Sequence, residues 1–162
     1  MKNDSIVFNP IGVVHSPHTQ PEKTPIQPRF ARSVTGRVTL NKEFEPGLKD
    51  ITGFSHIYLI YYLHRSSSSF SLEVTPCLDD TRRGLFATRA PSRPNRIGIS
   101  VVRLLKRSGC TLFIENVDIL DSTPLLDIKP YIPLFESENV SKGWTENLPG
   151  DKIEEQGSRG FS

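Results

Sequence analysis

Short apolar runs separated by turn residues constrain the fold of this chain more than any other feature of its sequence. Turn signals built from Gly, Pro, Asn and Ser recur about every ten residues, and no segment has the apolar spacing of a long amphipathic helix. This pattern is typical of an all-β barrel or sandwich. We therefore predict a mainly β domain of about six to eight short strands with little helix.

The apolar runs give the positions of the expected strands. They cover residues 11–16, 36–40, 54–63, 70–74, 84–88, 97–106 and 111–120. The run 54–63 is the most apolar and aromatic, so we expect a central strand covered on both faces. The alternation of 70–74 predicts a half-buried strand, and the break in alternation near Glu115 indicates a bulge.

Length and composition favour one folded domain. The chain has 162 residues, of which 36% are hydrophobic and 23% charged, and this is enough to bury a core. We expect a β-barrel domain over 6–135 and a polar C-terminal extension over 136–162, an extended tail with at most a short final strand. No apolar run approaches the length of a membrane span, so the sequence predicts a cytoplasmic protein without a membrane partner.

The cysteines and histidines argue against disulfide and metal chemistry. Cys77 and Cys110 are the only cysteines, too few for a disulfide scaffold, and we expect both as reduced, partly buried thiols. No ligand cluster with zinc spacing includes them. The histidines are His15, His18, His56 and His64. The sequence therefore predicts no metal.

Basic residues are concentrated in one part of the chain. The net charge is only +2, yet residues 81–114 contain no acid and carry Arg82, Arg83, Arg89, Arg93, Arg96, Arg103, Lys106 and Arg107. One interpretation is a basic face for a polyanionic partner. The other is a set of solvated strand ends, since basic patches are common on ordinary enzymes.

Three polar segments are too constrained to be simple connections. Residues 89–100 hold several arginines around two prolines, which gives a preorganised basic loop. Residues 121–124, Asp-Ser-Thr-Pro, form a turn that exposes polar atoms at a strand end. Residues 125–131 place Asp127 and Lys129 among apolar neighbours, where buried charges have to be paired or functional.

Several of these residues also have a purely structural interpretation. Asp121 is compatible with an ordinary turn residue, and Asp127 with Lys129 is compatible with an ion pair on one strand face. His64 is compatible with a satisfied histidine at a strand end. The proline-rich loop 17–29 differs from them, because loops of this length in compact domains are usually functional.

Five motifs occur in a fixed order along the chain. They are Gln27-Pro28-Arg29, Phe54-Ser55-His56, Gly84 to Arg89, Arg93 to Ser100 (Arg-Pro-Asn-Arg-Ile-Gly-Ile-Ser) and Asp121 to Tyr131 (Asp-Ser-Thr-Pro-Leu-Leu-Asp-Ile-Lys-Pro-Tyr). In this combination the chain resembles the TsaA-like, or TrmO, family from about Ile6 to Phe135. The last two motifs are long and unusual, so chance is a poor explanation for them.

The resemblance implies a fold, an activity and partners. The fold is a single-sheeted β-barrel, and the barrel works as a homodimer. It binds S-adenosylmethionine and methylates N6 of N6-threonylcarbamoyladenosine next to the anticodon of tRNA. By matching motifs, the resemblance implies cofactor contacts at Gln27, Pro28, Arg29, His64, Arg65, Arg89, Ile99, Asp121, Ser122, Thr123 and Pro124. Longer family members carry a further C-terminal domain, so the choice of tRNA stays open.

Two positions depart from the family pattern. The family commonly has Arg-Pro-Asn-Pro-Ile-Gly and Asp-Gly-Thr-Pro, whereas this chain has Arg96 in place of the second proline and Ser122 in place of the glycine. Arg96 adds charge to the loop. Glycine at position 122 would allow a positive φ or a close approach to a ligand, which serine allows only at some cost.

Methyl transfer to N6 mainly needs alignment of the sulfonium methyl with the nitrogen and exclusion of water. The nitrogen is a poor nucleophile, so we expect help from a base or from a group that polarises the carbonyl. Asp121 or Asp127 is the candidate acceptor, and Lys129 or Tyr131 the candidate polarising group. The candidates for the substrate carboxylate or the RNA phosphates are Arg93, Asn95 and Arg96.

Two other functions stay open on the sequence. One is a non-catalytic RNA-binding β-barrel that uses the basic face and aromatics such as Phe30 and Tyr131. The other keeps S-adenosylmethionine as cofactor but methylates another RNA or a small molecule. Binding of tRNA without binding of S-adenosylmethionine would favour the first.

Overall fold

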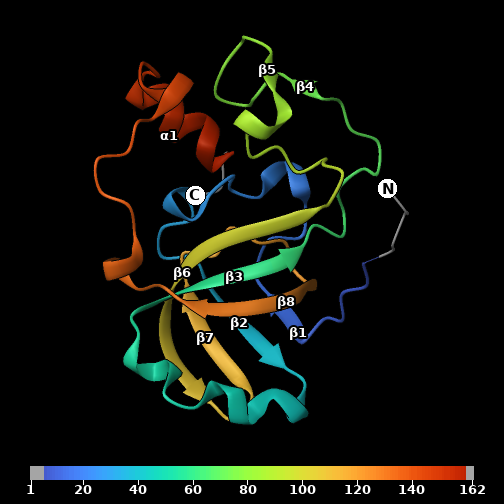
Figure 1. The fold of residues 1–162 in the computed structure, drawn as a ribbon, viewed down its shortest axis with the longest axis vertical. Helices are drawn as coiled ribbons and strands as arrows, with labels where there is room; N and C mark the ends of the chain where they lie inside the picture. Colours follow the sequence, from blue (N-terminus) through green and yellow to red (C-terminus); the bar gives the residue numbers. More distant parts are fainter. Residues whose placement is uncertain (1–5, 160–162) are drawn as a thin grey trace.

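Six antiparallel strands close into a single-sheeted barrel in the computed structural model, which describes residues 6–159 (Figure 1). The strands are β1 (Gly12–His15), β2 (Thr35–Leu40), β3 (His56–Tyr62), β6 (Ile97–Ser108), β7 (Thr111–Glu115) and β8 (Thr123–Pro130). Around the barrel they follow the order β1-β2-β7-β6-β3-β8, and β8 pairs back with β1. The mainly β barrel expected from the sequence is confirmed.

The remaining elements are short. β4 (Glu73–Val74) and β5 (Arg83–Gly84) form a two-stranded ribbon outside the barrel, and α1 (Gly150–Ser158) follows the barrel in the chain. The 3-10 turns are η1 (Pro21–Lys23), η2 (Pro28–Phe30), η3 (Lys42–Leu48), η4 (Ile51–Gly53), η5 (Leu85–Ala87), η6 (Pro133–Phe135) and η7 (Gly143–Thr145). Prolines open η1, η2 and η6, because the fixed φ of proline suits the first helical position.

The interior of the barrel is filled by alternate residues of each strand. On β3, Ile57, Leu59 and Tyr61 are buried, whereas Tyr58 and Ile60 face outward and stay partly exposed. The expectation that this run is covered on both faces is therefore wrong, because an antiparallel barrel buries only its inner face. The other strands contribute the fully buried Val14, Val38, Val102, Leu112, Ile114 and Leu125.

Two of the expected strands are largely absent from the described residues. Phe70 and Leu72 are exposed, and in this run only Glu73 and Val74 pair with another strand. The run 84–88 forms the turn η5 directly after β5. Both runs lie outside the barrel, so no barrel neighbour completes their hydrogen bonds.

The strand expected over 111–120 ends early. β7 stops at Glu115 because Asn116 adopts a φ of 65°, which breaks the extended backbone. The expected irregularity near Glu115 is therefore a strand end. Two register shifts lie on other strands: β6 has one between Leu104 and Lys106, opposite Ile114 and Phe113 of β7, and β3 has one between Ile60 and Tyr61 where it pairs with β8.

The C-terminal extension is not the extended tail that its polarity predicts. Residues 150–158 form α1, which packs against η2. The Ile26 N–H donates to the Gly157 carbonyl over 3.0 Å, so the helix is held by tertiary contacts. A helix of this length has too few residues for a clear periodic signal and is marginal by itself.

The two ends of the barrel are built differently (Figure 1). At one end, here called the loop end, β1, β3 and β7 finish and β2, β6 and β8 begin. At the opposite end, the hairpin end, β6 and β7 are joined through Gly109, whose φ is 56°. Leu48 of η3 and Ile51 of η4 are buried against the core there. The long connections therefore gather at the loop end.

Candidate functional site

The loop end collects segments that are far apart in the sequence. His64 follows β3, the loop 85–96 precedes β6, and the turn 116–122 joins β7 to β8. The proline-rich loop 17–29 leaves the end of β1 at the same end. Antiparallel pairing places these connections together, and most of the sequence-predicted site residues lie on them.

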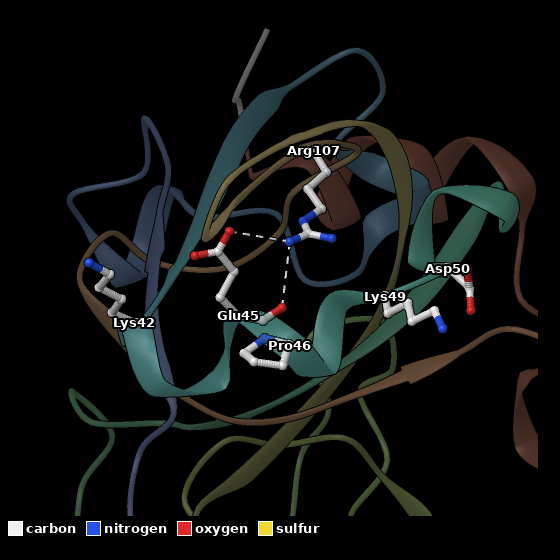
Figure 2. A pocket seen from close by; sticks show the side chains of 6 residues that line it. All are labelled: Lys42, Glu45, Pro46, Lys49, Asp50 and Arg107. Carbon is white, nitrogen blue, oxygen red and sulfur yellow. Dashed lines mark hydrogen bonds and ion pairs between the residues drawn. The ribbon is translucent and has the colours of Figure 1, made fainter.

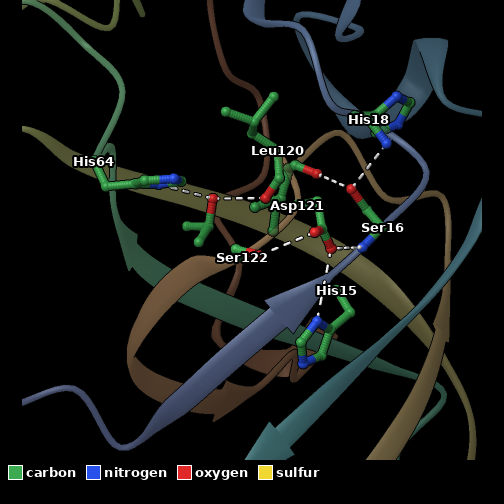
Figure 3. Close-up of polar contacts among 9 residues, drawn as sticks. His15, Ser16, His18, His64, Leu120, Asp121 and Ser122 are labelled. Carbon is green, nitrogen blue, oxygen red and sulfur yellow. Dashed lines mark hydrogen bonds and ion pairs between the residues drawn. The ribbon is translucent and has the colours of Figure 1, made fainter.

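Asp121 is fixed by residues from the end of β1 (Figure 3). The Ser16 N–H donates to Asp121 Oδ1 over 3.1 Å, and His15 Nδ1 lies 3.6 Å from the same oxygen. The Ser122 hydroxyl donates to Oδ2 over 2.9 Å. Partial burial acts to raise the pKa of Asp121, but these hydrogen bonds and His15 outweigh it and lower the pKa below its ordinary value. Asp121 is therefore ionised at neutral pH and is a weak proton acceptor.

Backbone atoms hold the same two segments together. The Ser16 hydroxyl donates to the Ile119 carbonyl over 2.5 Å, and the Asp121 N–H donates to the His18 carbonyl over 2.7 Å. These bonds satisfy polar groups that the strands leave at their ends. The turn is thus ordered before any ligand arrives, as an electrostatic binding site requires.

His64 is oriented by Thr123. The buried Thr123 hydroxyl donates to the Leu120 carbonyl over 2.7 Å and lies 3.3 Å from His64 Nδ1. Because the hydroxyl has only one hydrogen, the contact assigns the ring proton to Nδ1 and leaves Nε2 with a lone pair. Burial and the charge of Arg65 lower the pKa of His64, against an opposing effect of Asp121. The neutral ring therefore carries an acceptor nitrogen at the loop end.

Ser122 has the positive φ expected at its position. Its φ is 62°, in the left-handed region, where a side chain costs about 1 kcal/mol. Its hydroxyl bond to Asp121 offsets part of that cost. Thr123 and Pro124 then begin β8, so this motif turns the chain sharply into the barrel.

Arg89 joins the basic loop to the proline-rich loop. Its guanidinium donates to Gln27 Oε1, and Pro28 and Arg29 follow directly on η2. Arg29 Nη2 in turn lies 3.0 Å from a Glu154 carboxylate oxygen. Four of the residues that the motifs assign to the cofactor thus lie on two touching loops.

Arg93 organises the basic loop from within. Its guanidinium lies over the ring of Phe86, 5.7 Å from the centroid. A guanidinium has five N–H donors, so others remain for an anion while Nη1 fixes the loop. Nη1 donates over 3.4, 3.1 and 3.3 Å to the carbonyls of Leu85, Thr88 and Ala90.

Arg96 anchors the end of the same loop to the strand beside it. Its Nη1 donates to the Ser66 carbonyl over 2.9 Å, and the guanidinium lies 4.9 Å from the centroid of the Tyr62 ring. Asn95 is exposed beside it, and its carbonyl accepts the Ile97 N–H over 2.8 Å. A small hollow at this point is lined by Phe86, Arg93, Pro94 and Asn95.

A buried polar chain under the loop end is not predicted from the sequence. The Ser100 hydroxyl donates to Asp118 Oδ1 over 2.7 Å, and the Tyr61 hydroxyl lies 3.0 Å from Ser100 Oγ. Asp118 is 8% exposed and Ser100 only 2%. Burial raises the pKa of Asp118 to about 7, although the Ser100 hydroxyl and the charge of Arg89 act in the opposite direction. The Tyr61 ring rests on Gly98, where a Cβ would collide with it.

The sequence does contain a signal for these buried hydrogen bonds. Asp118 stands between Val117 and Ile119, so it is a charged residue among apolar neighbours. Treating 111–120 as a regular strand points Asp118 away from those two side chains and toward solvent. The backbone is irregular after Asn116, and all three side chains are buried.

Three predicted site residues lie on the outer wall of the barrel instead. Ile99 on β6 pairs with Ile60 on β3, which pairs with Asp127 on β8. Neighbouring strands are about 4.8 Å apart, so this row spans about 10 Å. Lys129 Nζ lies 2.9 Å from Asp127 Oδ2, and both side chains are substantially exposed. The ion pair expected from their spacing forms, but neither charge is buried.

Tyr131 lies toward the hairpin end. Its N–H donates to the His56 carbonyl over 3.1 Å, and its ring centroid lies 5.5 Å from that of Tyr58. β8, which runs from Thr123 to Pro130, extends about 3.3 Å per residue, so about 25 Å separates Tyr131 from the turn at Asp121. The structure does not bring Asp127, Lys129 or Tyr131 to Asp121.

A second open hollow lies at the hairpin end (Figure 2). Arg107 and Glu45 face each other across it. Arg107 Nη1 donates to the Leu48 carbonyl over 3.0 Å, and Arg107 Nη2 lies 3.5 Å from a Glu45 carboxylate oxygen. This hollow is lined by Lys42, Glu45, Pro46, Lys49, Asp50 and Arg107, and it contains no residue that the motifs assign to a function.

The two thiols differ in their exposure. Cys77 is exposed and Cys110 is half-buried, so the expectation of a partly buried thiol is met only at Cys110. Within residues 6–159, no group of three His, Cys, Asp or Glu side chains is placed to hold a metal ion. In the same residues no helix has the length and apolar character needed to cross a membrane.

Comparison with known proteins gives consistent matches. Residues 13–137 match the family described as the tRNA-methyltransferase O N-terminal domain. A probable S-adenosyl-L-methionine-binding protein of Pyrococcus abyssi is 54% identical over 142 residues, which cover 87% of this chain and 77% of that protein. A tRNA (adenine(37)-N6)-methyltransferase of Escherichia coli is 31% identical over 159 residues, which cover 92% of this chain and 68% of that protein.

Solved structures agree with these matches. A crystal structure of TrmO from Pseudomonas aeruginosa superimposes with a TM-score of 0.72 at 33% identity, covering 87% of this chain and 63% of that chain. The family match over 13–137 includes the barrel strands from Val13 onward and all sequence-predicted site residues from Gln27 to Tyr131, and it ends before η7 and α1. The chain belongs to the tRNA-methyltransferase O N-terminal domain family.

Proposed function

We propose that the protein is an S-adenosylmethionine-dependent tRNA methyltransferase that acts on N6 of N6-threonylcarbamoyladenosine next to the anticodon. The observation that carries the proposal is the convergence of the motif residues at the loop end, in a chain whose family is that of tRNA-methyltransferase O. Relatives named for S-adenosylmethionine binding and for adenine-N6 methylation of tRNA support the cofactor and the acceptor. We also propose a cytoplasmic location, which a tRNA acceptor supports.

The side chains at the loop end fit the charges of the cofactor. S-adenosylmethionine supplies an activated methyl group on a sulfonium, and it carries a carboxylate and an ammonium group. Arg89 suits the carboxylate, whereas the ionised Asp121 suits the cationic groups. The hydroxyls of Ser122 and Thr123 suit the ribose. Cofactor binding therefore exchanges the Arg89 contact with Gln27 for a contact with the ligand.

The hollow at Arg93 is the proposed place of the modified base. Phe86 is 73% exposed beside it, and an exposed aromatic ring is a stacking platform for an unpaired base. The donors of Arg93 that are not used by the loop suit the threonine carboxylate, with Asn95 and Arg96 next to it. These groups recognise the modification, and not adenosine alone.

A proton acceptor is needed for the proton that leaves N6. Asp121 lies among the cofactor residues, but its lowered pKa makes it a weak base. The neutral His64, with Nδ1 held by Thr123 and a lone pair on Nε2, is better suited to that role. We therefore propose His64 as the acceptor and Asp121 as the group that holds the cofactor.

A homodimer is also part of the proposal. Ile97 and Ile99 face outward on β6 and are 41% and 48% exposed, which leaves an apolar row on the barrel wall beside Asp127. A second protomer on this wall would bury the row and give Asp127, Lys129 and Tyr131 a route to a loop end. Sedimentation velocity should show a dimer that Ile99→Asp dissociates, and a monomeric wild-type protein would contradict this.

A different acceptor is the second candidate. The P. abyssi relative is named for S-adenosylmethionine binding alone. That name is compatible with methylation of another RNA or of a small molecule. A third candidate is a non-catalytic RNA-binding barrel, which the exposed Phe86 and the basic loop favour.

Transfer of a labelled methyl group from S-adenosylmethionine to tRNA tests these functions together. We expect label in tRNA that carries N6-threonylcarbamoyladenosine and none in the same tRNA without the modification. Equal label in both tRNAs would indicate an adenine methyltransferase that does not require the threonylcarbamoyl modification. Cofactor binding without transfer to tRNA would favour the other acceptors, and RNA binding without cofactor binding would favour the RNA-binding barrel.

A further inference from the structure

Residues 143–158, here called the C-terminal segment, lie against the loop end (Figure 1). The Gly157 carbonyl accepts the Ile26 N–H over 3.0 Å, and Gly157 rests so closely on the Phe30 ring that a Cβ would lie 2.7 Å from its atoms. Earlier in the same segment, Trp144 Nε1 donates to the Ala87 carbonyl over 2.7 Å. The segment therefore contacts both loops that carry the proposed cofactor residues.

One carboxylate of α1 sits between two arginines of the proline-rich loop and its continuation. Glu154 Oε1 lies 3.0 Å from Arg29 Nη2 and 3.8 Å from Arg32 Nη2. The side chains of Arg29 and Arg32 are 67% and 73% exposed, and that of Glu154 is 48% exposed. An anionic oxygen shared by two guanidinium groups is the arrangement that a backbone phosphate takes with arginines. Exposed ion pairs of this kind contribute little net stability, so a phosphate can replace Glu154.

The helix that carries Glu154 is short enough to leave. α1 has 9 residues, and an isolated helix of that length is marginal in water. Its single large apolar side chain, Ile153, is only half-buried. Apart from the packing of Gly157 on the Phe30 ring, the contacts of α1 with the loop end described above are therefore polar.

We propose that α1 covers an RNA-backbone site formed by Arg29 and Arg32, in which Glu154 takes the place of a phosphate until single-stranded RNA displaces the helix. The inference rests on the proposed function, because it assumes an RNA acceptor at the loop end. It adds a masked phosphate site beyond the basic loop, and it makes RNA binding compete with the docking of α1.

Fluorescence anisotropy with an anticodon stem-loop RNA, measured over a range of KCl concentrations, tests the competition. Glu154→Gln removes the competing charge and should tighten RNA binding about fivefold relative to wild type. The two arginines then hold counterions that RNA releases, so the salt dependence should steepen by about 1 in log–log slope. Gly157→Leu, which undocks α1 through the Phe30 ring and keeps the charge of Glu154, should also tighten binding.

Glu146→Gln is the matched control. It makes the same change of charge in the same segment, but Glu146 pairs with Lys142 at 3.7 Å and, among the described residues, forms no ion pair with Arg29 or Arg32. Equal RNA affinity of E154Q and E146Q would overturn the proposal, as would weaker binding by E154Q. In hydrogen exchange, RNA should reduce the protection of the α1 amides in the wild-type protein, and unchanged or increased protection would contradict displacement.

The outcomes separate this inference from the proposed function. Tighter RNA binding by E154Q, without methyl transfer to any tRNA, would support the proposal that α1 covers an RNA site and contradict the proposed methyltransferase activity. Methyl transfer to tRNA with equal RNA affinity of E154Q and E146Q would support the proposed methyltransferase activity and contradict the proposal that α1 covers an RNA site. The double variant Glu154→Gln with Arg32→Gln should lose most of the gain of E154Q, because one of the two unmasked arginines is then missing.

Discussion

Apolar side chains cover the core at the hairpin end of the barrel, whereas hydrogen-bonded polar side chains cover it at the loop end. At the hairpin end, Leu48 and Ile51 of two 3-10 turns pack on the core and are 3% and 9% exposed. At the loop end, the hydrogen-bonded chain of Tyr61, Ser100 and Asp118 takes that place. Burial of apolar surface stabilises the fold, whereas a buried polar chain costs free energy unless all of its members are satisfied.

This difference separates stability from binding within one small barrel. The hairpin end has a tight β6–β7 hairpin and an apolar plug formed by the β2–β3 connection, and an Arg107–Glu45 ion pair lines the hollow beside it. The loop end has long connections, and two residues with positive φ, Asn116 and Ser122, shape the turn that carries Asp121. We expect substitutions at the two ends to affect different measurements.

The largest effect is expected from Leu48→Ala at the hairpin end. Loss of this buried side chain leaves a cavity, so the free energy of unfolding should fall by about 2–5 kcal/mol. The affinity of the folded protein for S-adenosylmethionine should not change. Urea denaturation and calorimetric titration measure the two quantities, and a specific loss of cofactor affinity would show that the ends are not independent.

Arg89→Ala at the loop end should give the reverse result. A charge-assisted hydrogen bond contributes about 1.5–3 kcal/mol, so we expect cofactor affinity to fall about ten- to hundredfold with little change in Tm. Arg82→Ala is the control, because Arg82 is exposed on the outer ribbon, where it pairs with Glu73. Similar cofactor affinities for the two variants would remove Arg89 from the site.

Asp118→Asn tests how much stability the buried Asp118 carboxyl costs, through the dependence of stability on pH. Burial raises the pKa of Asp118 to about 7, whereas the unfolded carboxyl has a pKa of about 4. Between these values the folded state holds a proton that the unfolded state has lost, so stability falls as pH rises through this window. Asn keeps an acceptor for Ser100 and has no charge.

The expected result for Asp118→Asn is therefore a flatter dependence of Tm on pH between about 4 and 7, and a Tm at pH 8 that is higher by several degrees. Thermal denaturation followed by circular dichroism measures both. Asp151→Asn, which changes an exposed carboxylate of α1, is the control. An unchanged pH dependence of the D118N variant would mean that Asp118 has an ordinary pKa.

Ser122→Gly should have the smallest effect. Glycine relieves the positive φ of 62° at this position, so the free energy of unfolding should rise by about 1 kcal/mol or less. The same change removes the hydroxyl bond to Asp121 and should raise the pKa of that carboxyl. A lower stability in urea denaturation would show that the hydrogen bond outweighs the backbone cost.

The barrel strands are predictable because alternation and burial agree along them. The runs 36–40 and 97–106 match β2 and β6 closely, since their apolar positions face a common interior. Alternation alone is not enough at 70–74, where Phe70 and Leu72 have no barrel neighbour and stay exposed. α1 is missed for the opposite reason, because contacts with the proline-rich loop stabilise it and its own periodicity does not.

Prediction of the site depends on register, which the sequence does not supply. The motifs identify Gln27, Arg89 and Asp121, and the fold brings these residues to one end. A charge among apolar neighbours suggests burial equally for Asp127 and for Asp118. Asp127 lies on the outward row of β8, whereas Asp118 follows a strand end and turns into the protein. Only the pairing of the strands distinguishes the two.

Hydrogen exchange on addition of S-adenosylmethionine tests most directly whether the loop end is the binding site. We predict that amides in 24–31, 85–96 and 116–123 become protected, while those of η3, η4 and the β6–β7 hairpin do not change. The same experiment on the Arg89→Ala variant should show the protection only at higher cofactor concentrations. Protection centred on the hollow at Arg107, or none at saturating cofactor, would contradict the assignment of the cofactor to the loop end.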